Sequence, residues 1–191
     1  MTFEDNNYYR EKFTKLILND EQVKAKEFED CKFENCSFVN CRFEKLKFIN
    51  CQFTECILSA IMPVNSRFLE VKFTKCKVIG FQWSESQGVR SLEFIDCQLN
   101  YSNFSYLKLP DIKMPGCEIK EVDFTEADLS NGDFKNTDFE KSRFFNTNLT
   151  NTDFRGAKNY YIDVKNNNLK KARFSFPEAL SLLNCLDIII E

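Results

Sequence analysis

The chain has 191 residues, a length that suggests one domain or at most two small ones, and its 43 % hydrophobic and 29 % charged residues are typical of a globular chain. The net charge of −3 argues against binding of nucleic-acid phosphates by the molecule as a whole. The absence of His excludes catalysis, metal ligation and pH switching by imidazole.

A large apolar residue recurs every five residues along most of the chain, and most of the 21 Phe belong to this series. Pro63 and Asn159 interrupt the series, and one extra residue enters around positions 86–88. In chain order the centres are Phe13, Leu18, Val23, Phe28, Phe33, Phe38, Phe43, Phe48, Phe53, Leu58, Phe68, Phe73, Val78, Trp83, Phe94, Leu99, Phe104, Leu109, Met114, Ile119, Phe124, Leu129, Phe134, Phe139, Phe144, Leu149, Phe154, Val164, Leu169 and Phe174.

A period of five fits neither the 3.6-residue turn of a helix nor the two-residue alternation of a strand. It fits a chain that turns a corner every five residues and places one large side chain inside on each side. Four sides close a square coil, and stacked coils bury a continuous core. A second inward position, two residues before each centre, is small and is filled by Cys, Ser, Thr, Ala or Gly.

The five-residue pattern resembles that of the pentapeptide repeat proteins. The segments 127–131 (ADLSN), 137–141 (TDFEK) and 152–156 (TDFRG) match the family's order of a small residue, Asp or Asn, and then Leu or Phe. The resemblance implies an all-β fold, a right-handed quadrilateral β-helix of about seven coils. At about 4.8 Å per stacked strand, such a rod is about 35 Å long.

Three segments are expected along this rod: an N-terminal cap at 1–12, the repeat β-helix at 13–175, and a helix with a tail at 176–191. Ser175, Pro177 and Glu178 are typical of the start of an α-helix. One interpretation is a helix that caps the last coil. The other, which we favour and which resembles many members of the family, is a homodimer formed end to end. The expected interface residues are Phe176, Leu180, Leu183, Leu186 and Ile188.

Nine Cys raise the possibility of a metal or redox site. Eight of them occupy the small inward position, and Cys185 does not. Stacked neighbours about 4.8 Å apart are too distant for usual disulfide geometry, so we expect reduced apolar fillers beside the Phe rings and no bound metal. Many reduced thiols also indicate a cytoplasmic protein.

Charge is unevenly distributed, since Lys and Arg outnumber Asp and Glu in 26–83 and the reverse holds in 84–163. Carboxylates repeated along a rod approximate the spacing of DNA phosphates. The layout resembles the Qnr and MfpA branch of the family, which implies a DNA mimic that binds DNA gyrase or topoisomerase IV. The alternative is an ordinary solvated face, because Asp before the centre belongs to the general repeat pattern. The candidate partner-binding residues are Glu118, Asp123, Glu126, Asp128, Asp133, Asp138, Glu140 and Asp153.

A filled solenoid offers no cleft for convergent catalytic groups, so we expect a protein that is not an enzyme and has no cofactor. No apolar run reaches the roughly 18 residues of a membrane span, and the first 20 residues lack a signal-peptide core. The favoured function is protection of DNA gyrase from quinolones or a toxin, without direct binding of nucleic acid or membrane. The alternative is a generic scaffold or protein-interaction rod with no topoisomerase activity.

Overall fold

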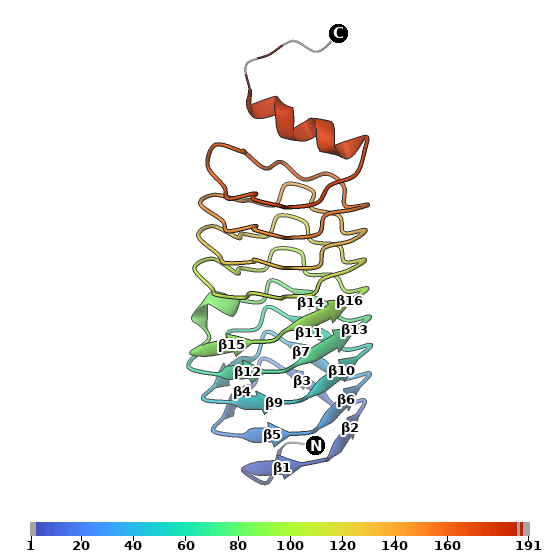
Figure 1. The fold of residues 1–191 in the computed structure, drawn as a ribbon. Coiled ribbons are helices and arrows are strands. Elements are labelled where there is room, and N and C mark those ends of the chain that lie inside the picture. Colours follow the sequence, from blue (N-terminus) through green and yellow to red (C-terminus); the bar gives the residue numbers. More distant parts are fainter. Residues whose placement is uncertain (1–2, 187, 189–191) are drawn as a thin grey trace.

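A computed structural model of the chain describes residues 3–186 and residue 188. The chain winds as a right-handed coil with four sides, from the N-terminus at one end to a short helix at the other (Figure 1). Equivalent residues in successive coils pair in parallel about one coil apart, for example Phe28 with Phe48. The prediction of a pentapeptide-type β-helix is confirmed.

The strands of each side form one sheet, and these sheets with their continuations define four faces of the rod. Face 1 contains β1 (Asn7–Tyr9), β5 (Glu27–Glu29), β9 (Lys47–Ile49), β12 (Arg67–Leu69) and β15 (Gly88–Arg90). Face 2 contains β2 (Lys12–Thr14), β6 (Lys32–Glu34), β10 (Gln52–Thr54), β13 (Lys72–Thr74) and β16 (Glu93–Ile95). Face 3 contains β3 (Ile17–Asn19), β7 (Ser37–Val39), β11 (Ile57–Ser59) and β14 (Lys77–Ile79). Face 4 contains β4 (Gln22–Lys24) and β8 (Arg42–Glu44).

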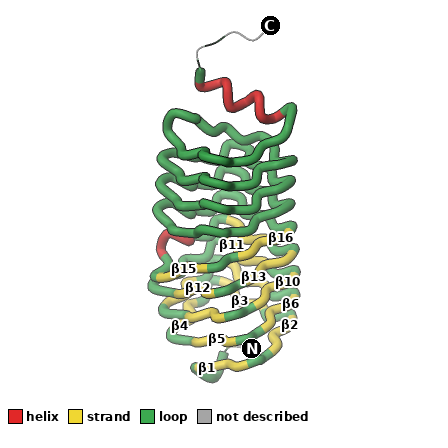
Figure 2. The backbone as a smooth tube through the Cα atoms, in the orientation of Figure 1, coloured by secondary structure: helices red, strands yellow, loops and turns green. Residues whose placement is uncertain are grey.

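Three-residue strands build about four coils, whereas about seven coils were expected for the repeat region as a whole (Figure 2). Beyond them the same four faces continue through isolated parallel bridges, from Glu93↔Lys113 to Asp153↔Arg173 on face 2. The replacement of three-residue strands by isolated bridges follows from a different turn geometry at the corners of the later coils. In the later coils the backbone N–H three residues after a centre donates to the carbonyl of that centre, as from Thr137 to Phe134 (3.3 Å). This bond and a positive φ at the residue before it, such as Asn136 (φ 58), define a type II turn.

The interior is a stack of aromatic rings, as the five-residue period predicted. Rings in one column are nearly parallel, for example Phe33 and Phe53, whose centroids lie 4.5 Å apart at 6°. Rings on adjoining faces meet edge to face, as Phe28 meets Phe33 at 5.4 Å and 72°. Both arrangements suit the aromatic quadrupole, and with the aliphatic centres such as Leu58 and Leu129 the rings form one buried core.

Two of the three irregular points of the series, the extra residue and Asn159, have specific structural solutions. The extra residue at 86–88 is accommodated by a short 3₁₀ helix, η1 (Trp83–Glu85), after which Gly88 pairs with Arg67. At the second point, Asn159 does not point inward. The next residue, Tyr160, is buried in its place and packs against Phe154, with ring centroids 5.9 Å apart.

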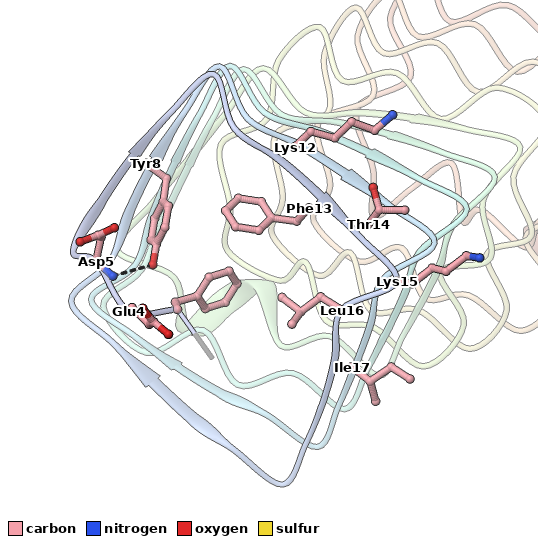
Figure 3. A pocket seen from close by; sticks show the side chains of 10 residues that line it. Glu4, Asp5, Tyr8, Lys12, Phe13, Thr14, Lys15, Leu16 and Ile17 are labelled. Carbon is pink, nitrogen blue, oxygen red and sulfur yellow. Dashed lines mark hydrogen bonds between the residues drawn. The ribbon is translucent and has the colours of Figure 1, made fainter. Parts of the chain in front are cut away.

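The first coil begins at Asn7, within the segment 1–12 that was expected to be a cap. Tyr8 keeps the five-residue phase and stacks on Phe28 at 5.1 Å and 9°, so β1 is already part of the ladder. Phe3 covers part of this end by packing against Tyr8 and Phe13. An open depression of about 820 Å³ remains, into which Tyr8 and Phe13 point (Figure 3).

The C-terminal helix lies across the last coil, but it is the 3₁₀ helix η2 (Glu178–Cys185) and not the expected α-helix. Ser175 does not provide the expected cap, because its hydroxyl accepts a hydrogen bond from the N–H of Gly156 (2.8 Å) instead. Leu182 packs against the core, and the Ser181 hydroxyl donates to the carbonyl of Tyr160 (3.4 Å). The tight helix thereby covers the rings of the final coil.

Eight Cys lie inside the coils as predicted, and all nine are free thiols. Each inward thiol donates to backbone carbonyls, as Cys51 does to Phe28 (3.3 Å) and Ile49 (3.4 Å). In one column the sulfur of Cys56 also accepts the backbone N–H of Cys36 (3.3 Å). The thiols therefore serve as hydrogen-bonded apolar fillers, and burial raises the pKa of Cys51 to about 12.

Truncation of an inward ring should be far more damaging than truncation of an outward one. Phe139→Ala removes a fully buried ring and is expected to lower the free energy of unfolding by about 3–5 kcal/mol in urea denaturation. Phe145→Ala, at a site 41 % exposed, is the matched control and should cost less than about 1 kcal/mol. Equal losses would contradict the inward and outward assignment.

The buried thiols should make stability depend on alkaline pH. The pKa of Cys51 is raised in the folded state, so its protonation favours folding, and that contribution is lost as pH rises from about 9 toward 12. Between pH 9 and 10.5 under reducing conditions, the unfolding free energy of the wild type should fall more steeply than that of Cys51→Ala. The expected difference approaches about 1.4 kcal/mol per pH unit, and parallel curves would contradict it.

Candidate functional site on the acidic coils

The eight candidate carboxylates surround the rod and do not form one strip. Their positions follow from the parallel bridges that place each residue above its partner in the previous coil. Asp128 lies on face 1, Asp133 and Asp153 on face 2, Glu118, Asp138 and Glu140 on face 3, and Asp123 and Glu126 on face 4 and its corner.

Most of these Asp side chains have a structural task at the turns. One carboxylate oxygen of Asp123 accepts the backbone N–H of Thr125 (2.8 Å), and Asp128 accepts that of Ser130 (3.0 Å). Asp133, Asp138 and Asp153 make the equivalent bond to the residue two positions later. Such Asx turns fix the corner that follows, which explains why Asp or Asn precedes the centre in the later coils.

Basic side chains are interleaved with the carboxylates of face 3. The ammonium group of Lys120 lies 3.4 Å from a carboxylate oxygen of Glu118 and 3.3 Å from one of Glu140. A hydrogen bond from Asn100, followed by that from Lys120, lowers the pKa of Glu118. Lys158 lies 3.6 Å from Asp138 in the next coil. The negative charge of this column is therefore largely compensated.

Face 2 contains a still more compact cluster around Asp153, whose side chain is 11 % exposed. Arg155 donates to this carboxylate at 2.6 Å, and Lys135 lies 3.6 Å away. The bond from Arg155 dominates and lowers the pKa of Asp153 to about 2. A lowered carboxyl pKa stabilises the fold at neutral pH, and this contribution is lost as pH falls toward 2. Asp153 is better suited to holding the coils together than to contacting a partner.

One coil carries carboxylates that form no ion pair among the described residues. We call Glu121, Asp123, Glu126 and Asp128 the acidic ring. Glu121 and Glu126 are exposed at corners, where φ is 54° and 56°. In Asp123 and Asp128 one carboxylate oxygen accepts the hydrogen bond of the turn, and the second oxygen takes no part in that bond. Glu121 was not among the eight candidates, although its corner position in the five-residue phase is visible in the sequence.

The expected dimer-interface residues differ in exposure. Phe176 is 80 % exposed and Leu180 is 46 % exposed, and Ile188 also faces solvent. Leu183 and Leu186 are partly buried at the end of η2. The C-terminal element thus presents apolar surface beyond what the last coil covers.

Residues 3–186 and 188 contain no group of three His, Cys, Asp or Glu side chains arranged to hold a metal ion. No helix among them is long and apolar enough to cross a membrane.

Comparison with known proteins agrees with this architecture. A family model described as "Pentapeptide repeat region" matches residues 26–104, and one described as "Pentapeptide repeats (8 copies)" matches residues 123–158. A trypsin-treated variant of QnrB1, a plasmid-mediated fluoroquinolone resistance protein, aligns with a TM-score of 0.72 at 17 % identity, covering 97 % of this chain and 98 % of that chain. A second trypsin-treated QnrB1 variant gives a TM-score of 0.51 at 16 % identity, covering 94 % and 100 %. The search of curated proteins gives no match.

These matches define the class of protein. The chain belongs to the pentapeptide repeat family, and its β-helix resembles that of QnrB1 over nearly its whole length. At this level of identity the structural likeness concerns the fold.

The turn function of the carboxylates predicts different effects for two substitutions of Asp128. Its carboxylate accepts the N–H of Ser130 (3.0 Å) and the side-chain amide of Asn148 (2.9 Å). Asp128→Ala loses both bonds and should lower the free energy of unfolding by about 1–2 kcal/mol. Asp128→Asn keeps an acceptor oxygen, as Asn103 does at the equivalent position, and should lose less than half of that. Equal losses in urea denaturation would show that the turn bond is unimportant.

Proposed function

We propose that this protein is a non-enzymatic binding protein that occupies the DNA-binding surface of a type II topoisomerase, such as DNA gyrase, in the cytoplasm. By doing so it protects the enzyme from quinolones or from a gyrase toxin. The acidic ring is the observation that carries this proposal, because its carboxylates form no ion pair among the described residues and stand on a narrow rod. The fold likeness to a fluoroquinolone resistance protein supports the choice of target.

The acidic ring can replace DNA phosphates through simple electrostatics. Exposed Glu121 and Glu126 stand at two corners, with Asp123 between them on face 4. Basic residues of a DNA-binding surface would exchange phosphate contacts for these carboxylates, with a strong dependence on salt. The compensated carboxylates of faces 2 and 3 would contribute less, since Lys120, Lys135 and Arg155 already neutralise them.

A homodimer is part of this proposal. Phe176 and Leu180 on the C-terminal element are exposed apolar residues of the kind that a two-fold contact would bury. End-to-end pairing would place the acidic rings of both copies on one longer rod. Light scattering should then report about twice the chain mass of 22.5 kDa.

The proposal predicts rescue of gyrase supercoiling in the presence of ciprofloxacin, with the purified protein titrated from nanomolar to tens of micromolar concentrations. The double variant Glu121→Lys/Glu126→Lys should lose at least about tenfold in potency, because each charge reversal adds repulsion from basic residues. Both corners tolerate Lys, which already occupies the equivalent corner at Lys141 (φ 58).

Glu55→Lys/Asp111→Lys is the matched control, because it makes the same charge change at two exposed corners outside the ring. It should retain the potency of the wild type. An equal loss of potency in both variants would show that the effect depends only on the net charge of the protein and not on the acidic ring. No rescue and no inhibition by the wild type at any concentration would refute the topoisomerase proposal.

The second candidate is a protein-interaction rod without topoisomerase activity. The observation that favours it is the use of Asp133, Asp138 and Asp153 in turns and ion pairs, which leaves no continuous acidic strip. In that case a pull-down with the wild-type protein should recover a partner other than a topoisomerase.

A further inference from the structure

The exposed large apolar side chains of the rod gather on two adjoining faces. Seven of them lie on faces 3 and 4 or their corners, and in the described part of the repeat region the other one is Tyr9 on face 1. Along the chain these seven are Ile17, Ile57, Met62, Tyr101, Tyr106, Phe145 and Tyr161. The rod therefore has two chemically different sides.

The middle of this apolar side is also poor in charge. We define the mid-rod patch as the outward side chains of 57–65, 77–85 and 98–106, three segments stacked on faces 3 and 4. Lys77 and Glu85 are its charged members. At the same level, faces 1 and 2 carry ion pairs such as Arg90–Glu70 and Lys72–Glu93.

This composition is characteristic of the centre of a protein interface. Aromatic residues and Met are enriched there, whereas Lys, Glu and Asp are depleted. In the mid-rod patch Tyr101 is 58 % exposed, Tyr106 is 67 % exposed and Met62 is 42 % exposed. The corner beside them projects little from the rod, because the two residues that precede Tyr101 in the same column are the small Ala60 and Gly80. A partner can thus approach the flat sheet closely.

The acidic ring borders this patch directly. Asn103 of the patch pairs with Asp123 of the ring. The N–H of Tyr101 donates to the carbonyl of Lys120 (2.9 Å), and that of Tyr106 donates to Thr125 (2.9 Å), so these Tyr lie one coil from Glu121 and Glu126. Apolar surface and unpaired negative charge are therefore continuous on one side of the rod.

We propose that faces 3 and 4 form the docking side of the protein, with the mid-rod patch at the centre and the acidic ring at its border. Charge complementarity defines the occupant, a protein surface with an uncharged centre and basic residues along one edge. This inference rests on the proposed function and refines it. The topoisomerase contacts faces 3 and 4 and the acidic ring, including Asp128 at the edge of face 1, while face 2 and the rest of face 1 remain in solvent.

The test is binding of reconstituted DNA gyrase to immobilised protein, measured by biolayer interferometry. Met62→Lys/Tyr101→Lys should weaken binding at least about tenfold, equivalent to about 1.4 kcal/mol. Lys is compatible with both sites, since Lys77 and Lys75 occupy equivalent strand and corner positions. The control Gln52→Lys/Ser91→Lys adds the same charge at exposed strand and corner sites of faces 1 and 2 and should bind within about twofold of the wild type.

Three outcomes would overturn the inference, and they differ in whether the topoisomerase proposal survives. If the control loses affinity and the patch variant does not, the docking side is wrong while the topoisomerase proposal survives. If the wild type does not bind gyrase, both fail together. If light scattering shows that Met62→Lys/Tyr101→Lys halves the mass of the wild type, the patch is a contact between two copies. Circular dichroism should show equal melting of both variants, so that lost binding is not lost folding.

Discussion

Everything in this rod depends on one repeated contact, the stacking of a large inward side chain, often a ring, on the equivalent side chain one coil away. The spacing of parallel strands, about 4.8 Å, matches the 4.5 Å between the rings of Phe33 and Phe53. The hydrogen-bond ladder and the ring stack therefore reinforce each other wherever rings follow one another in a column. Because each coil contacts its neighbours, stability accumulates along the axis as in other solenoids. The surface is then free to vary, provided that each corner can adopt its positive φ.

The corners determine how much of the negative charge is available for binding. Asp128 and Asp133 hold the turns that follow them, and Arg155 and Lys135 neutralise Asp153. An acidic composition in the later coils is thus largely a requirement of the type II turns. The charge that remains available is that of Glu121 and Glu126 and of the second carboxylate oxygens of Asp123 and Asp128. Together these make up the acidic ring beside the exposed Tyr residues of faces 3 and 4. Function on this fold is better sought in departures from the repeat pattern than in the pattern itself.

The sequence predicted the fold well because one period governs both the inward side chains and the corners. It located the extra residue at 86–88 and the inward position of eight Cys. It did not predict that Tyr160 replaces Asn159 in the core, since that exchange depends on the helix η2 packed above it. The 3₁₀ character of η2 was also missed, because Ser175 is engaged by Gly156 of the previous coil. The candidate carboxylates belong to outward positions of the coils, although Asp153 is buried there by its ion pairs. Their distribution over four faces follows from the 20-residue coil. Their ion pairs could not be predicted, because these depend on the conformations of long Lys and Arg side chains.

The central claim is that the Asp side chains of the later coils are bonded to their own turns. It is tested most directly by following backbone amide proton shifts in NMR spectra as pH falls from 7 to 2. The amides of Thr125, Ser130, Lys135, Glu140 and Arg155 should each shift as the Asp two positions earlier is protonated, that of Arg155 only in part because the pKa of Asp153 is about 2. The chemical shift of the Thr74 amide proton should not change with pH, because the residue two positions earlier is Lys72 and not an Asp. Insensitive amides at the five turn positions would contradict the account and leave these carboxylates free for a partner.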